Sequence, residues 1–361
     1  MRRAALGLAL FSGLLGPIPA AAQDVGCVHP LEAEPPPWHA QPHLPLARGE
    51  GVRVAVIDTG VAPHPELGHV EALADLVSPA APDPLLDCDG HGTVVAGVIR
   101  GIAPGAQILS VRQSSGHYRD TAGGTLATLT EGIHRALDAG ARVINISVVS
   151  CLDASLLLDA RPLHDALHRA EAEGVIVIAA AGNVGGQCQP GMAVYPAGEE
   201  TVLSVAAVHP GDPHALADYT LSVGDLAAPG RVPVGLSPHG HGWAAGTRHP
   251  QGTEAGFEGT SFSAPVVSGV AALLRERHPH DSAADIRQRL LQSASPGHGV
   301  IDPYAATSHL LADYRVAGRE VGVDTQPVRE AATGRTALQV LGAAAVAALL
   351  IGPVRAGWRR G

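Results

Sequence analysis

Short apolar runs rich in β-branched residues alternate with segments of helical spacing along the middle of the chain. The apolar runs predict strands at 52–57, 108–111, 143–149, 175–179 and 202–208, and the helical spacing predicts helices at 92–100, 125–139 and 154–173. Apolar strands separated by helices are what a mainly parallel sheet covered by helices on both faces requires. The pattern therefore predicts a three-layer α/β fold for one domain at 51–304, followed by a closing helix and a linker over 305–336.

The N-terminus carries the pattern of an export signal. Arg2 and Arg3 precede an apolar run that ends at Leu15, and three alanines follow at 20–22. A charged start, an apolar stretch and a small-residue cleavage site are typical of a secretory signal peptide, whereas a buried first helix is the alternative. We expect a signal peptide at 1–22 and an extracytoplasmic body.

The C-terminus carries a second apolar segment, which has no charge from 337 to 354 and is followed by Arg355, Arg359 and Arg360. At about 1.5 Å per residue it reaches roughly 27 Å, just enough to cross a bilayer core. A buried terminal helix is the alternative, because the segment is rich in Ala and contains Gly and Pro. We expect one transmembrane helix at 337–354, with the basic tail at 355–361 in the cytoplasm.

Charge and composition narrow the function. The chain has a net charge of −10, all of its basic residues are Arg, and it contains only three Trp, five Tyr and three Phe. No basic surface and few stacking aromatics argue against nucleic-acid binding. The Pro-rich segment at 23–50 has no helical or strand periodicity, so we expect an extended wrap along the domain that does not inhibit it.

Four short motifs hold the candidate chemistry. Asp58 ends the first strand as Asp-Thr-Gly, and His91 begins a helix as His-Gly-Thr. Asn183 follows a buried strand after Ala-Ala-Gly, and Ser261 stands in Gly-Thr-Ser-Phe-Ser-Ala-Pro at the start of an apolar helix that runs to about 278. Singly, each has a plain structural alternative: a loop-capping Asp, a satisfied polar His, a turn Asn and an N-cap Ser.

Together, the four motifs point to one reaction. Asp58, His91 and Ser261 follow one of the known chain orders of a Ser-His-Asp triad. The four motifs resemble those of the subtilisin-like serine proteases over residues 52 to about 279. The resemblance implies Ser261 as nucleophile, His91 as general base and then acid, and Asp58 as the partner that fixes the imidazole tautomer. It also implies an oxyanion hole formed by Asn183 and the Ser261 backbone N–H, with no cofactor.

Within these proteases the chain is most similar to the mycosins, membrane-anchored proteases associated with type VII secretion in actinobacteria. The signal peptide, the short Pro-rich extension, the four Cys, the C-terminal span and the run Asp87-Cys88-Asp89-Gly90-His91 carry this resemblance. It implies a single-pass cell-membrane endopeptidase that acts on protein or peptide substrates beside the secretion complex. Two alternatives stay open: a scaffold of that complex with secondary proteolysis, and a general degradative exoprotease.

Four cysteines in an exported chain predict two disulfides, with three possible pairings. Cys151 and Cys188 both follow strand ends on the face that carries the active site. This placement favours a bond between them and a second bond from Cys27 to Cys88, which pins the extension beside the catalytic centre.

Other chemistries fit the sequence less well. An aspartic protease needs two Asp-Thr-Gly loops, and the chain has one. The 19 His include His239 with His241 and His278 with His280, but neither pair has a third ligand in view, so no metal site is expected. No acidic cluster with the spacing of a structural calcium site stands out.

Overall fold

The computed structural model describes residues 26–36, 46–117, 124–153, 159–186 and 188–310. These residues belong to one compact unit that ends at Ala312. Both expected terminal segments, the signal peptide at 1–22 and the membrane span at 337–354, lie outside the described residues. Within the described ranges, no helix has the length and apolar character that crossing a membrane requires.

An eight-stranded sheet lies at the centre of the domain, in the order β10-β9-β7-β5-β2-β4-β3, with β11 also paired to β9. All pairs are parallel except that of β10 with β9. The strands are β2 (Arg53–Asp58), β3 (Val70–Asp75), β4 (Gln107–Arg112), β5 (Val143–Ile146), β7 (Ile176–Ala180), β9 (Val202–His209), β10 (Asp212–Leu216) and β11 (Leu226–Pro229). Each of the five predicted runs forms one of these strands, although β5 ends at Ile146.

Strand β2 shows why these runs become buried strands. Its side chains alternate between the two faces of the sheet, so that Val54 and Val56 join one apolar core while Ala55 and Ile57 join the other. All four are fully buried. A strand with a core on each face carries no alternating polar residues, which explains its continuous apolar run.

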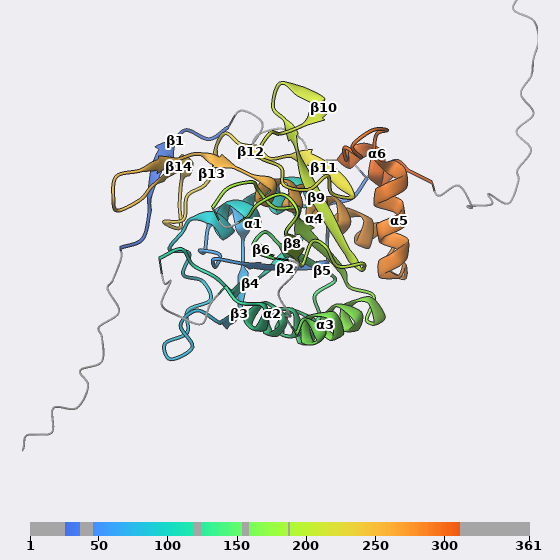
Figure 1. Cartoon of the computed structure of the whole chain (residues 1–361), viewed down its shortest axis with the longest axis horizontal. Helices are drawn as coiled ribbons and strands as arrows, with labels where there is room; N and C mark the ends of the chain where they lie inside the picture. The colour runs from blue at the N-terminus through green and yellow to red at the C-terminus, as the bar shows by residue number, and fades with distance from the viewer. Residues whose placement is uncertain (1–25, 37–45, 118–123, 154–158, 187, 311–361) are drawn as a thin grey trace, which may run out of the picture. The chain divides into compact units, whose positions relative to one another are not determined.

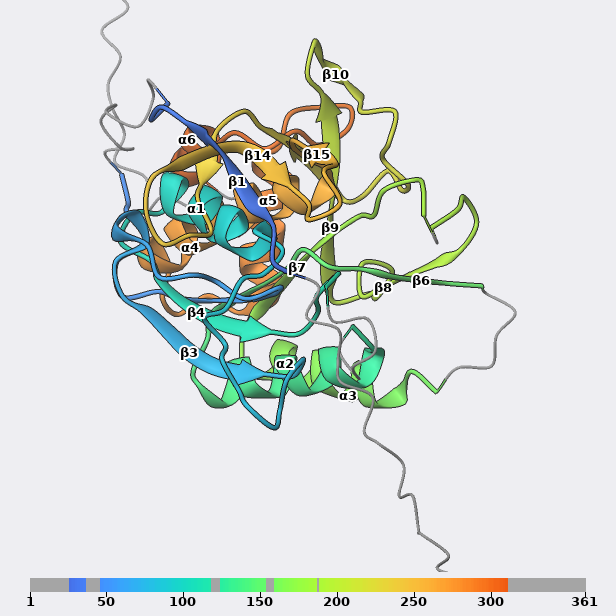
Figure 2. The same cartoon turned by 90° about the vertical axis from the view of Figure 1, so that its left-hand side faces the viewer.

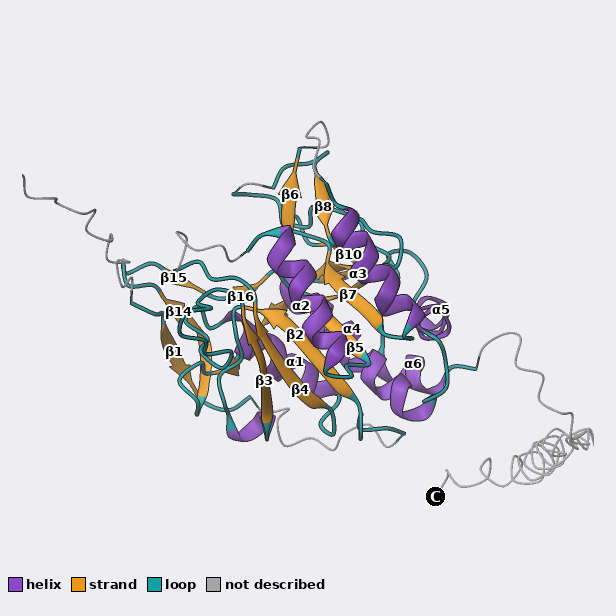
Figure 3. Cartoon of the chain, turned by 90° about the horizontal axis from the view of Figure 1, so that it is seen from below, coloured by secondary structure: helices purple, strands orange, loops and turns teal. Residues whose placement is uncertain are grey.

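Helices cover both faces, as Figures 1 and 3 show. One face carries α2 and α3, whose apolar sides form a core with the sheet, and the other carries α1 and α4. The helices are α1 (His91–Ile102), α2 (Leu126–Asp138), α3 (Arg161–Ala172), α4 (Thr260–Arg277), α5 (Ala283–Ser293), α6 (Pro303–Ser308) and the 3-10 turn η2 (Pro65–Leu67). Residues 154–158 of the predicted helix at 154–173 lie outside the described residues, and α3 begins at Arg161, where Pro162 suits a first turn.

Helices α1 and α4 pack closely, which matters because they carry His91 and Ser261. Gly269 of α4 faces Ile102 of α1, and a Cβ built on this glycine would lie 2.8 Å from the Ile102 Cβ. A larger residue at 269 would therefore push the two helices apart.

Part of the N-terminal extension, expected as an extended wrap, forms a strand that sequence periodicity did not reveal. β1 (His29–Ala33) pairs antiparallel with β14 (Trp243–Arg248), and Figure 2 shows the two side by side. β14 also pairs with β13 (Gly235–Leu236) and β15 (Glu254–Ala255). Sequence periodicity missed β1 because its five residues contain a proline and its partner lies far along the chain.

The far end of the extension is also attached. The Glu276 side chain at the end of α4 accepts hydrogen bonds on Oε2 from the backbone N–H groups of Arg48, Gly49 and Glu50, at 2.7, 2.5 and 3.1 Å. One carboxylate oxygen thus holds three successive amides where the extension enters the domain.

Two further short antiparallel strand pairs complete the fold. β6 (Ser150–Leu152) pairs with β8 (Ala193–Tyr195), and β12 (Arg231–Val232) pairs with β16 (Phe257–Glu258), which leads directly into α4. These short pairs lie beyond the carboxyl ends of β5 and β7 and just before α4, and therefore border the region where the candidate residues gather.

Candidate active site

Asp58 is the last residue of β2 and its side chain is fully buried. Its Oδ1 accepts a hydrogen bond from the backbone N–H of Thr59 at 2.8 Å. The same oxygen lies 2.6 Å from His91 Nδ1, and because the carboxylate can only accept, the imidazole carries its proton on Nδ1. Nε2 is then left free to accept a proton.

His91 begins α1, and glycines on both sides bring it to the end of β2. Gly90 precedes the helix with a φ of 71°, in the left-handed region. A Cβ on Gly92 would lie 2.0 Å from the Gly60 carbonyl oxygen and 3.1 Å from the Asp58 Cβ, so only glycine permits this approach. The His91 side chain is 27% exposed, which leaves one edge open to a substrate.

Opposing influences set the pKa of His91. Burial by itself lowers it, but the negative charge of Asp58 and the hydrogen bond to Asp58 raise it, and the charges of Asp87 and Asp89 add to the rise. The net result is a pKa above the ordinary value. This is the direction expected when a carboxylate stabilises the imidazolium.

Ser261 lies in the first turn of α4, where free N–H groups and the helix dipole favour negative charge. Its backbone carbonyl accepts a hydrogen bond from Ser147 Oγ at 2.7 Å, just beyond the end of β5. The next side chain, Phe262, packs against the His91 ring at a centroid distance of 5.1 Å. The first turn of α4 therefore contacts His91 through Phe262, although no hydrogen bond joins the Ser261 and His91 side chains in the described part of the chain.

Further polar contacts fix the position of Ser147. Asn145 Nδ2 donates to Ser147 Oγ at 2.9 Å, and Ser268 Oγ on α4 donates to Asn145 Oδ1 at 2.9 Å. All three side chains are buried. These hydrogen bonds connect α4 to the end of β5 at two points, through Ser261 and through Ser268.

Asn183 follows β7, and its amide has a fixed orientation. Its Oδ1 accepts hydrogen bonds from the backbone N–H and the hydroxyl of Thr260, at 3.0 and 3.1 Å. The Thr260 hydroxyl in turn accepts from Gly182 N at 3.1 Å. Because the carbonyl end is occupied by a backbone donor, the Nδ2 end is the one available to a substrate oxygen.

The space beside that amide depends on Gly259. A Cβ there would lie 2.8 Å from Asn183 Nδ2, and the glycine has a φ of 151°, which side chains rarely adopt. Asn183 and Ser261 are thus both placed by contacts with the segment Gly259–Thr260.

The structure therefore joins Asp58 to His91 directly and brings Ser261 and Asn183 together through Thr260. Sequence reasoning missed three side chains of this region: Thr59, Asp87 and Thr260. Each stands within a motif already singled out, and this position beside a candidate catalytic residue is the signal that could have found them.

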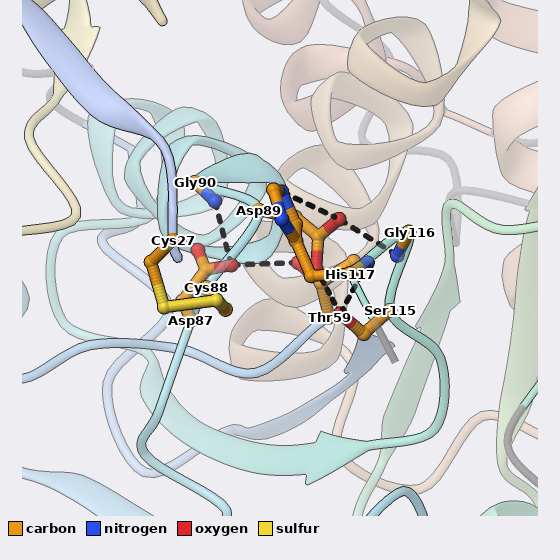
Figure 4. Close-up of a disulfide and its surroundings, with 9 residues drawn as sticks. All are labelled: Cys27, Thr59, Asp87, Cys88, Asp89, Gly90, Ser115, Gly116 and His117. Atoms are coloured by element: carbon orange, nitrogen blue, oxygen red, sulfur yellow. Dashed lines mark hydrogen bonds and ion pairs between the residues drawn. A yellow bond between two sulfur atoms is a disulfide. The ribbon is translucent and has the colours of Figure 1, made fainter. Parts of the chain in front are cut away.

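The two disulfides join Cys27 to Cys88 and Cys151 to Cys188, the pairing that was expected. Figure 4 shows the first bond beside the turn that leads into His91. Val28 N also donates to the Cys88 carbonyl oxygen at 3.0 Å, so β1 is held at this turn by two links.

Described residues from α2, α3 and the region around β6 line a cavity of about 700 Å³. Its walls include Leu126 and Leu163, Val149 just beyond Ser147, and the cysteines 151 and 188.

Nowhere in the described ranges do three or more His, Cys, Asp or Glu side chains gather as a metal site would require.

Residues 49–326 match the Subtilase family. The chain belongs to the subtilase family of serine proteases. Mycosin-4 of Mycobacterium tuberculosis is 38% identical over 309 residues, which cover 73% of this chain. That alignment takes in 66% of Mycosin-4, just under two thirds of its length.

Two solved structures support the same subtilisin-like α/β fold. The crystal structure of MycP1 from Mycobacterium smegmatis is 29% identical with a TM-score of 0.71, covering 79% of this chain and 89% of that one. A chain of an intact ESX-5 inner membrane complex is 30% identical with a TM-score of 0.69, covering 92% of this chain and 93% of that one. This subtilase is therefore similar to the mycosins in both sequence and fold.

Proposed function

We propose that this subtilase is a serine endopeptidase that hydrolyses peptide bonds through Asp58, His91 and Ser261. The observation that carries the proposal is the 2.6 Å contact between Asp58 Oδ1 and His91 Nδ1, with Ser261 in the first turn of α4, whose Phe262 packs against the imidazole. A buried carboxylate, a histidine with a free Nε2 and a serine at a helix N-terminus are the three parts of an activated nucleophile.

The reaction begins when the Ser261 hydroxyl attacks the carbonyl carbon of a peptide bond and gives its proton to His91 Nε2. Asp58 stabilises the imidazolium that forms. The oxyanion accepts hydrogen bonds from Asn183 Nδ2 and from the Ser261 backbone N–H; one such donor contributes about 3–4 kcal/mol to lowering the barrier. His91 then protonates the leaving amine. A water molecule attacks the acyl carbon and gives a proton to His91, which passes it to the Ser261 oxygen as the ester bond breaks and the acid product leaves.

A second part of the proposal concerns place and pathway. We infer that the protein acts outside the cytoplasm, anchored by a helix at 337–354, on proteins that pass through a type VII secretion system. The similarity to mycosins and to a chain of an ESX-5 inner membrane complex supports this role. The cavity beside Val149 offers an apolar surface on which an extended peptide substrate can dock.

The test of the chemistry is labelling of the full-length protein with a fluorophosphonate probe. We expect the wild type to be labelled and the Ser261→Ala variant not to be. Ser263→Ala is the matched control, because Ser263 lies on the same helix but is buried and bonds the Ala228 carbonyl oxygen. Labelling that survives Ser261→Ala would rule out Ser261 as the nucleophile.

A scaffold role is the second candidate function, favoured by the coverage of the membrane-complex chain over 92% of this one. Expression of Ser261→Ala in a host that lacks the gene separates the two roles. Failed rescue of secretion means that proteolysis is required, whereas normal rescue by an unlabelled variant moves the essential role to the scaffold. Recovery of active protein outside the membrane fraction would instead favour a degradative exoprotease.

A further inference from the structure

A second carboxylate lies behind the catalytic pair, in the turn that leads into α1. Asp87 is buried, and both of its oxygens are fully engaged. Oδ1 accepts from Thr59 Oγ1 at 2.8 Å and from Gly90 N at 2.9 Å. Oδ2 accepts from Thr93 N at 2.8 Å and from Thr93 Oγ1 at 2.6 Å. Figure 4 shows Asp87 between Thr59 and Gly90.

These four donors come from the segments that hold the catalytic pair. Thr59 directly follows Asp58 at the end of β2, while Gly90 and Thr93 flank His91 at the start of α1. The Thr93 hydroxyl also accepts from Ala62 N at 3.0 Å, which adds a second link to the segment after β2. Asp87 therefore connects the two elements whose separation sets the Asp58–His91 distance.

The donor set requires a carboxylate at this position. Each oxygen accepts one backbone N–H, and a backbone N–H cannot turn around to accept a proton. An asparagine would place its NH2 group against Gly90 N or Thr93 N, whichever way it was oriented. One backbone donor would then be buried without an acceptor.

The Thr59 hydroxyl links this carboxylate to the catalytic one. Its oxygen accepts from Gly92 N at 3.0 Å, and its single proton faces Asp87 Oδ1 at 2.8 Å and Asp58 Oδ1 at 3.3 Å. While Asp87 is ionised, the shorter contact takes the proton. When Asp87 is protonated and donates to Thr59, the Thr59 proton can turn only toward Asp58, where it competes with His91.

We propose that Asp87 is a positioning residue that holds Asp58 and His91 in register through Thr59, and that this function requires its ionised form. The proposal rests on the peptidase function proposed above. Asp87 itself touches no substrate and acts through its neighbours.

Several charges face this group. Burial raises the pKa of Asp87 to about 6; hydrogen bonds from Thr93 and Thr59 oppose the rise, and the charge of Asp58 on β2 adds to it. Asp87 and Asp89, from the same turn, both raise the pKa of His91 on α1. Asp89 in turn faces His117 from the segment after β4, at 3.9 Å. Asp87 therefore titrates near pH 6, and its protonation there removes one of the charges that raise the His91 pKa.

Two variants are expected to move the acid limb of the pH profile in opposite directions. Asp87→Asn removes one charge that raises the His91 pKa, so its acid limb should shift to lower pH. The variant also removes one titrating group, so activity in the acid limb should be lost with the binding of one proton instead of two. Thr59→Val removes a hydrogen bond that keeps Asp87 ionised, so its acid limb should shift to higher pH. Thr59→Ser keeps the hydroxyl and should restore the wild-type profile.

The measurement is kcat and KM of the full-length protein against pH, normalised to sites titrated with the fluorophosphonate so that only folded enzyme counts. Asp87→Asn should lower kcat about tenfold to a hundredfold with little change in KM. Asp89→Asn is the matched control in the same turn. Its carboxylate accepts from Ser115 Oγ and Gly116 N, so this variant should shift the limb slightly downward but keep two protons.

The proposal is supported if the acid limbs of Asp87→Asn and Thr59→Val shift in opposite directions and Thr59→Ser keeps the wild-type profile. Shifts in the same direction, a two-proton limb in Asp87→Asn, or a Thr59→Ser variant that behaves like Thr59→Val would overturn it. If Asp87→Asn does not fold, Thr59→Val and Thr59→Ser still test the proposal, because Thr59→Val moves the acid limb to higher pH only if it raises the pKa of Asp87. A wild type that is never labelled would instead overturn the peptidase function, and the positioning role with it.

Discussion

The two halves of the proposed active site are held by different kinds of interaction. Asp58 and His91 are bonded to each other and backed by Asp87, so charges hold this half. Ser261 and Asn183 are placed by neutral groups, the hydroxyl of Ser147 and the backbone and hydroxyl of Thr260. This difference predicts that pH changes activity through the Asp58–His91 half. The contribution of the Ser261–Asn183 half should change only when particular hydrogen-bond donors are removed.

The largest effect is expected from Asp58→Asn, in the charged half. An amide cannot stabilise the imidazolium, and it can donate to Nδ1 and leave the proton on the wrong nitrogen, so kcat should fall by about 10⁴-fold. Steady-state hydrolysis of a peptide substrate measures this loss. A loss below about tenfold would mean that charge is not what holds this half.

In the neutral half, Asn183→Ala should lower kcat by about 10²- to 10³-fold, because one oxyanion donor is removed. The acid limb of its pH profile should stay where it is in the wild type, since no charge near His91 changes. A displaced acid limb would show that the two halves are electrically coupled, contrary to the comparison.

Thr260→Val tests how the Asn183 amide is oriented. The variant removes the hydroxyl that bonds Asn183 Oδ1 but keeps the backbone donor, so we expect kcat to fall about tenfold with KM nearly unchanged. Thr260→Ser is the control and should retain most of the activity. Equal losses in both variants would show that the hydroxyl alone does not orient the Asn183 amide.

The smallest expected effect is a shift in the midpoint of the wild-type acid limb away from the ordinary pKa of histidine. A protonated His91 cannot accept the Ser261 proton, so activity is complete above the His91 pKa and is lost as pH falls through it. Because Asp58, Asp87 and Asp89 raise that pKa, the midpoint should lie above 6.5, the ordinary value for histidine. A rate profile of kcat/KM against pH measures it, and a midpoint below 6.5 would mean that burial outweighs the carboxylates.

Local patterns in the sequence were sufficient for the elements that build the sheet. The run at 52–57 is continuous because β2 is covered on both faces, and this can be read without knowing any partner strand. The motifs of Asp58 and His91 are likewise local, since a strand end and a helix start define them. Their contact in the structure follows from the parallel order of the sheet.

Features that depend on distant partners were not predictable in the same way. β1 is a strand because β14 offers it hydrogen bonds, and nothing within its own residues signals that partner. The start of α3 at Arg161 also differed from the periodic pattern, which included residues 159 and 160 in the helix. Likewise, Asp87 reads as an ordinary turn residue until its four donors are seen.

The attachment of the extension at both ends has a consequence for how processing would appear on a gel. Cys27 is bonded to Cys88, and Glu276 accepts hydrogen bonds from the backbone N–H groups of Arg48, Gly49 and Glu50. A single cut between Ala33 and Leu46 would therefore produce a two-chain molecule that gains only one water in mass and does not separate until the disulfide is reduced. The small N-terminal fragment would stay paired to β14 after the cut, so maturation could pass unnoticed in a non-reducing separation.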